Sequence, residues 1–157
     1  MMVNRYFGSK EQLFAEAIAE TMAKTSVLTP IILDAHASGE EIAAALINIT
    51  KKDATPLEGF QIMLRSASNE RASEIGREQI ENHHQRLIAA ALSGDLAPQR
   101  AGVVLSLVAG FQIMRQMIGL SPLTEADPKA LVKILGPVFE QLIKGERSGG
   151  DVPPKET

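Results

Sequence analysis

The amino-acid sequence predicts an all-α fold, a bundle of helices that contains no strand. Hydrophobic residues make up 45% of the 157 residues and aromatic residues only 4%, so we expect a core of Ala, Leu, Ile, Val and Met. A core of that composition favours helices over a sandwich or a barrel. Apolar residues also recur at helical spacing, as at Leu13, Phe14, Ala17 and Ile18, and no stretch shows the alternation typical of a strand.

Start and stop signals predict the helices of the first half. Ser9 and Gln12 form a capping box, which predicts a helix from Lys10. This helix is expected to end near Leu28, because Thr29-Pro30 disfavours its continuation. The other elements expected here are a kinked extension over residues 31–37, a helix from Glu40 to about Lys52 after a break at Ser38-Gly39, and a short helix that begins at Thr55-Pro56.

Similar signals predict three longer helices in the second half. Pro137 lies inside the last of them and is expected to kink it. Residues 146–157 are polar and rich in Gly and Pro, which predicts a disordered tail. The expected helices are residues 70–92 (cap Asn69, stop Gly94), residues 98–118 (stop Gly119) and residues 128–144 (start Asp127-Pro128, stop Gly145).

Composition limits the possible functions. The chain has no cysteine, which excludes disulfides and thiolate chemistry and fits a cytoplasmic protein. A net charge of −3 and a pI of about 5.6 argue against nucleic-acid binding by the body of the chain. The longest apolar stretch, residues 101–114, is too short to span a bilayer. We therefore expect a cytoplasmic location and no membrane partner.

The segment from Asn4 to Leu13, NRYFGSKEQL, resembles the signature of tetracycline-repressor-like (TetR-type) transcriptional regulators. In that family an aromatic-rich recognition helix runs into F-x-S-K-E-x-L, which opens the helix linking the DNA-binding and regulatory domains. Residues 100–119 and 123–143 resemble the C-terminal helix pair through which these proteins dimerise. The resemblance implies that residues 1–9 are the remnant of a recognition helix and turn. Residues 10–145 would then form the effector-binding and dimerisation domain of a regulator whose helix-turn-helix is incomplete here.

Four residues near the N-terminus match family positions that contact DNA, mostly at the phosphate backbone. Arg and Lys side chains neutralise phosphate and Tyr can donate to it. An isolated turn cannot dock in a groove. We therefore expect operator DNA to be a partner only of the intact protein, with these side chains solvated in the present chain. The four residues are Asn4, Arg5, Tyr6 and Lys10.

Apolar residues of the middle helices allow two interpretations, core filling or a ligand pocket. The family resemblance implies that these helices surround a mostly apolar cavity, in which a few amide and imidazole groups orient a small, largely apolar effector. No pair of carboxylates falls on these faces, so a cationic effector is not expected. The predicted ligand-binding residues are Phe60, Met63, Leu64, Ile80, His83, His84, Leu87, Val104, Leu107, Val108, Phe111 and Gln112.

The stretch from Ala101 to Phe111 is apolar nearly all round, with Ser106 as its only polar residue. A helix that is apolar on every side needs burial on every side, and a single chain covers only its inner face. The last two helices are therefore expected to form an intermolecular four-helix bundle in a homodimer. The predicted interface residues are Gly102, Leu105, Ala109, Leu131, Leu135, Val138 and Leu142.

Other classes of function stay open as alternatives. Glu81-x-x-His84 occurs once, whereas di-metal bundles need two such motifs and two further carboxylates, so no metal or other cofactor is expected. No nucleophile elbow or phosphate-binding glycine loop is present, so we do not expect an enzyme. The favoured function is a ligand-responsive transcriptional regulator of the repressor type. The alternatives are a small helical-bundle enzyme or metal-binding protein, and an interaction module without a pocket.

Overall fold

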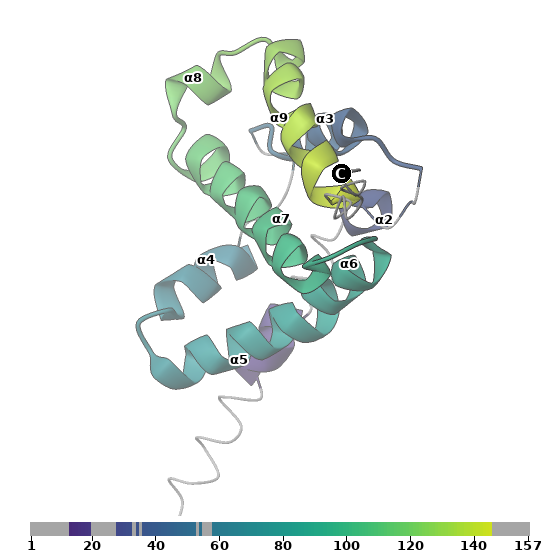
Figure 1. Ribbon diagram of the computed structural model, residues 1–157. Helices are drawn as coiled ribbons and strands as arrows, with labels where there is room; N and C mark the ends of the chain where they lie inside the picture. The colour runs from purple at the N-terminus through teal and green to yellow at the C-terminus, as the bar shows by residue number, and fades with distance from the viewer. Residues whose placement is uncertain are drawn as a thin grey trace, which may run out of the picture.

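The computed structural model describes residues 13–19, 28–32, 34, 36–52, 54 and 58–145. The regular structure of this part of the chain is entirely helical, as expected for an all-α fold (Figure 1). The capping box at Ser9, the Thr55-Pro56 start and the tail from residue 146 lie outside the described residues. None of the described helices has both the length and the apolar character that crossing a bilayer requires.

Residues 13–19 are helical. Among the later helices, α9 packs against α3, which is far from it in the sequence (Figure 1). Two π-helical segments, η1 and η2, interrupt the long helices of the second half. The elements are α2 (Leu28–Ile32), α3 (Gly39–Ile49), α4 (Glu58–Ser66), α5 (Glu70–Ile80), η1 (Glu81–Gln85), α6 (Arg86–Ala91), α7 (Ala97–Gln112), η2 (Ile113–Met117), α8 (Ser121–Thr124) and α9 (Pro128–Lys144).

Side-chain caps start the helices where the sequence predicts them in the second half. The Asn69 side chain accepts a hydrogen bond from the backbone N–H of Ala72, and the Asp127 side chain accepts one from Lys129, with Pro128 as the first residue of α9. These caps satisfy backbone donors that the first turn leaves unpaired. Glycines with positive φ stand at the predicted stops, namely Gly94, Gly119 and Gly145.

Several predicted boundaries in the first half were wrong. α3 covers Gly39–Ile49, whereas the helix was predicted from Glu40 to about Lys52. Ser38 is non-helical, as the predicted break requires, and it caps α3 in a capping box with Glu41. Among the described residues of the predicted extension over residues 31–37, Ile31 and Ile32 are helical, whereas residues 34, 36 and 37 are not. The N–H of His36 donates to the Asp34 carboxylate in a turn. Thr29-Pro30 does not end a helix, because both residues lie in α2, whose first turn tolerates proline.

The core forms where α3, α6, α7 and α9 meet. Phe139 is completely buried and is the largest side chain there, and burial of such a side chain contributes about 1.5–3 kcal/mol. Figure 1 shows α9 lying over α3, α7 crossing the middle of the molecule, and α4 and α5 pairing beyond α7. The buried core residues are Ile32, Ile42, Ala43, Leu46, Ile47, Ile88, Leu92, Ala101, Val104, Phe111, Leu131, Leu135 and Phe139.

The contact between α3 and α9 is unusually close because glycines form it. A Cβ atom on Gly39 would clash with the carbonyl oxygen of Gly136 and with the backbone nitrogen of Glu140. The N–H of Gly39 donates to the Glu140 carboxylate at 2.5 Å, so α9 supplies an anion to the N-terminus of α3. The ammonium of Lys144 also pairs with Glu140. The hydrogen bond from Lys144, and to a smaller extent the one from Gly39, hold the pKa of the Glu140 carboxyl below its usual value.

Replacement of Gly39 by Ala should destabilise the protein by about 1–3 kcal/mol, because the new methyl group meets backbone atoms that cannot rotate away. Gly76→Ala is the matched control, since a Cβ there meets only Met63 side-chain atoms at ordinary contact distances of 3.6 and 3.7 Å. Urea unfolding followed by circular dichroism measures both variants. Equal unfolding free energies for Gly39→Ala and the wild type would contradict this account of the α3–α9 contact.

Candidate functional site: a helical groove and two uncovered helix faces

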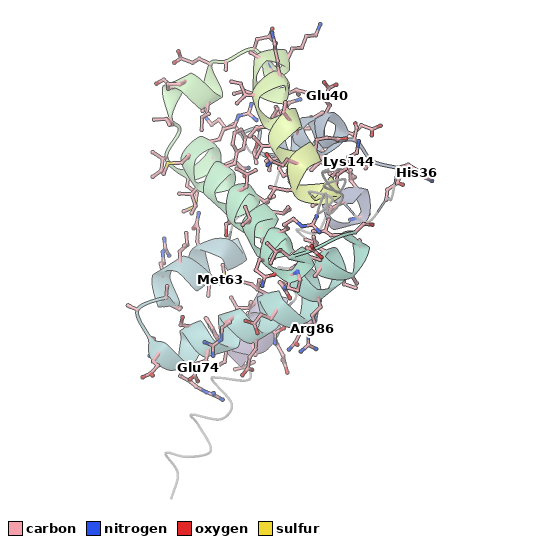
Figure 2. The ribbon with its side chains drawn as sticks, viewed as in Figure 1. His36, Glu40, Met63, Glu74, Arg86 and Lys144 are labelled. Carbon is pink, nitrogen blue, oxygen red and sulfur yellow. The ribbon has the colours of Figure 1, made fainter. Side chains whose placement is uncertain are left out.

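Two of the predicted ligand-binding residues line a groove between α4 and α5. The groove has a volume of about 310 Å³, near the lower end of the range of small-molecule sites. Met63 lies on the side of α4 that faces α5, and its side chain reaches Gly76 (Figure 2). The groove is lined by Met63, Ala67, Ser73, Gly76, Arg77, Ile80 and Glu81. It therefore combines an apolar wall with a hydroxyl group and one charge of each sign.

The two predicted histidines lie in η1, next to this groove in the sequence. His83 is exposed, and its Nδ1 lies 3.1 Å from the carbonyl oxygen of Gln79. His84 is half-buried. Its burial lowers the pKa of its imidazole, and the neighbouring His83 lowers it further to a smaller extent. His84 is therefore neutral at pH 7 and can both donate and accept a hydrogen bond. Leu64 and Leu87 are 40% and 50% exposed and do not line the groove.

The predicted ligand-binding residues of α7 lie elsewhere. Val104 and Phe111 are buried in the core with residues of α3 and α9, while Leu107 and Val108 pack partly buried against it. Gln112 is also buried, with 8% of its surface exposed. For Val104 and Phe111 the packing favours the core-filling interpretation. Among the predicted residues whose side chains the structure describes, Met63 and Ile80 line the groove. The side chain of Phe60 lies outside the described residues.

Large apolar side chains stay exposed on α9 and on the helix formed by α7 and η2. Val103 is 52% exposed, Met114 47% and Met117 37%, and on α9 Ile134 is 66% and Val138 42% exposed. Val103 and Met114 are eleven residues apart and lie on one side of the α7–η2 helix, and Ile134 and Val138 are four residues apart and lie on one side of α9. Met117 follows within η2. Figure 1 shows α7 and α9 together at the front of the molecule. We call these five residues the uncovered faces.

The predicted interface residues fall into three groups. Val138 belongs to the uncovered faces, and a Cβ at Gly102 would meet open space. Leu131 and Leu135 are buried in the chain's own core, so a second chain would meet Ile134 and Val138 rather than these two leucines. Leu105, Ala109 and Leu142 are partly buried. Helical periodicity identifies the apolar stripe of α9, but its edge residues, not its centre, remain accessible.

Comparison with protein-family models matches residues 37–143 to the family described as "Tetracyclin repressor-like, C-terminal domain". The chain belongs to this family. The match spans all the elements from α3 to most of α9, and therefore both the groove and the uncovered faces. The predicted recognition of a TetR-type regulator and of its helical C-terminal domain is thus confirmed. A search of the curated proteins and a search of the solved structures each found no match.

Other predicted features of this tetracyclin repressor-like domain are not covered by that match. Asn4, Arg5, Tyr6 and Lys10 lie outside the described residues. Within the described part of the chain, no three His, Cys, Asp or Glu side chains gather in an arrangement that could hold a metal ion.

The two π-helical segments of the domain were not predicted from the sequence. Each widens one turn, so that the N–H of Arg86 bonds to the carbonyl of Glu81 and that of Ile118 to Ile113. Such a turn rotates the following residues by about 100° relative to an uninterrupted α-helix. Arg115 lies within η2 and is buried, with 8% of its surface exposed.

Arg115 joins three elements from a buried position. Its Nη1 donates to the carbonyl of Ile47 at 2.6 Å and to the hydroxyl of Thr50 at 3.0 Å, at the C-terminus of α3. Its Nε donates to the carbonyl of Leu123 in α8, and its guanidinium lies 5.8 Å from the ring centre of Phe111. Burial lowers the pKa of Arg115, but a guanidinium remains charged at neutral pH. The positive charge stabilises the negative end of α3.

Replacement of Arg115 by Met should lower the unfolding free energy by about 3 kcal/mol. Methionine keeps much of the apolar stem, yet the carbonyls of Ile47 and Leu123 lose the hydrogen bonds that Arg115 donates. Arg86→Met removes an exposed guanidinium from α6 and is the control for the change in charge. Urea titrations at pH 7 compare the two. An Arg115→Met midpoint equal to that of Arg86→Met would show that these hydrogen bonds add no stability.

Proposed function

We propose that this chain is the effector-binding and dimerisation domain of a ligand-responsive transcriptional repressor that acts in the cytoplasm. The observation that carries the proposal is the family match over residues 37–143, combined with apolar helix faces that the single chain leaves uncovered. In the intact regulator, a dimer would present two DNA-binding heads to an operator. The effector would favour a placement of the first helix that spaces the two heads wrongly for the DNA.

The dimer is proposed to form through the uncovered faces. Contiguous exposed apolar surface of this kind marks an interaction site. Two helices from each chain, packed about a two-fold axis, would give a four-helix bundle. Gly102 and Gly110 support the packing, because a Cβ on either would meet no atom within 4 Å and a second helix can approach closely there. Ser106 and Gln141 are exposed on the same helices and would lie at the rim.

Asp in place of Ile134 or Val138 should convert the dimer to monomers. Both side chains are exposed in the single chain, so the substitution leaves the core intact but brings two buried carboxylates together across the two-fold axis. Multi-angle light scattering at micromolar concentration should give twice the chain mass of 16.9 kDa for the wild type and the single mass for the variants.

Ala90→Asp, at an exposed position of α6, is the control and should remain dimeric. Leu135→Asp is less informative, because Leu135 is buried in the chain's own core and its loss would unfold the domain. A monomeric wild type, or dimers in both Ile134→Asp and Val138→Asp, would refute this interface.

The effector is proposed to bind at the α4–α5 groove. Met63 and Ile80 offer an apolar wall, and Ser73, Arg77 and Glu81 offer groups that can orient a ligand. We expect a neutral or weakly acidic, largely apolar molecule. Movement of α4 or α5 would have to be transmitted to the helix at residues 13–19, whose Ile18 is buried, and through it to the DNA-binding heads. Without such differential contact the ligand could not shift the equilibrium.

A thermal-shift screen of apolar small molecules tests this site. A ligand present at about 100 times its Kd should stabilise the wild type by about 2.7 kcal/mol. Ala67→Leu fills the groove and should abolish most of that stabilisation. Ala90→Leu adds the same side chain at an exposed position outside the groove and should keep it. Equal stabilisation of both variants would place the effector elsewhere.

A further inference from the structure

A second groove, of about 660 Å³, lies between α3 and α9. Its floor consists of small or buried apolar side chains, namely Ala44, Ala45 and Ile47 of α3 and Val132 of α9. From Glu40 to Asn48 the lining follows α3 for about 12 Å, since each helical residue adds 1.5 Å. Glu40, in the first turn of α3, belongs to this lining (Figure 2). We call it the α3–α9 groove.

Three lysines surround the α3–α9 groove, although the whole chain carries a net charge of −3. Lys129 and Lys133 are one turn apart on α9, and Lys51 follows α3 on the opposite wall. Within the described part of the chain, no carboxylate pairs with these ammonium groups. Glu40 is the only acidic residue of the lining, and the nearby Asp127 already accepts the N–H of Lys129 as the cap of α9. The groove is therefore a local positive site on an acidic protein.

The apolar lining indicates the shape of the occupant. None of the exposed large hydrophobic residues of the described chain lies in this lining, so the groove offers few of the large side-chain contacts that dominate binding between proteins. The alanines leave a narrow apolar floor that suits a slim chain instead. A volume of 660 Å³ is within the range of small-molecule sites.

We propose that the α3–α9 groove binds a small amphiphilic anion. Its apolar tail lies on Ala44, Ala45, Ile47 and Val132, and its carboxylate or phosphate head group pairs with the lysines, chiefly Lys129 and Lys133. This site is separate from the α4–α5 groove and does not depend on the proposed effector site. It is also compatible with the proposed dimer, because Val132 and Ile134 are about 200° apart around α9.

Titration of isotopically labelled protein with decanoate, below its micellar concentration, tests the proposal by NMR. Decyl phosphate forms a second arm that distinguishes a phosphate head group from a carboxylate. At least one of them should bind saturably and shift the backbone amides of Ala44, Ala45 and Val132. Decanol and decyltrimethylammonium should bind far more weakly. An increase in salt from about 0.05 M to about 0.5 M should weaken anion binding, because exposed charges are then screened.

Variants separate the lysines of the groove from the general charge of the protein. Lys129→Gln with Lys133→Gln should weaken binding about fivefold to tenfold, in line with two partly exposed ion pairs. Lys52→Gln with Arg86→Gln removes the same charge from exposed positions outside the lining and should leave the affinity unchanged.

Three results would overturn the proposal. The first is an equal loss of affinity in both double variants. The second is a set of shifts confined to the α4–α5 groove or to the uncovered faces, with none in the α3–α9 groove. The third is binding of a glutamate-rich helical peptide in the α3–α9 groove when neither decanoate nor decyl phosphate binds, which would assign the groove to an acidic protein segment.

Discussion

The close approach of α3 and α9 is the constraint on which the rest of the structure depends. Gly39 and Gly136 let the two backbones meet, and the Glu140 carboxylate fixes the contact by accepting the N–H of Gly39. Because the helices are this close, their apolar stripes join those of α6 and α7 in one core around Phe139. The α3–α9 groove lies alongside this crossing, and Ile134 and Val138, on another side of α9, face the solvent.

Two arginines stabilise the C-terminal ends of α3 and α9 by donating hydrogen bonds to backbone carbonyls. Arg115 binds the C-terminal end of α3, while Arg100 donates to the carbonyls of Leu142 and Ile143 at the end of α9. Positive charge at a helix C-terminus opposes the helix dipole and satisfies carbonyls that have no partner in the helix. In the proposed function, α3, α7 and α9 thus form a fixed frame that carries the dimer interface, and the α4–α5 pair is the part that an effector can displace.

The sequence predicted the local features of this fold better than its long-range ones. The caps at Asn69 and Asp127 and the glycine stops were correct because each depends on a few neighbouring residues. The π-helical segments were missed, since their widened turns arise where packing overrides regular spacing and no residue type marks them. Among the predicted ligand-binding residues with described side chains, Met63 and Ile80 line the α4–α5 groove, whereas Val104 and Phe111 lie in the core, because helical periodicity does not say whether an apolar stripe meets a cavity or a core.

The arrangement of the two sides of α9 explains how one helix can serve two purposes. Its Leu131, Leu135 and Phe139 fill the core, Ile134 and Val138 remain exposed, and Val132 lines the groove next to α3. Ile134 and Val138 lie at one edge of the core-facing side of α9 and Val132 at the other edge, next to Phe139, so a partner chain and a groove ligand would not compete for the same atoms. The proposed dimer interface and the α3–α9 groove both depend on the contact between α3 and α9, however. Any ligand that altered how these helices cross would also alter the position of Ile134 and Val138. Coupling between the groove and the dimer therefore requires no contact between their occupants, only a change in how α9 lies on α3.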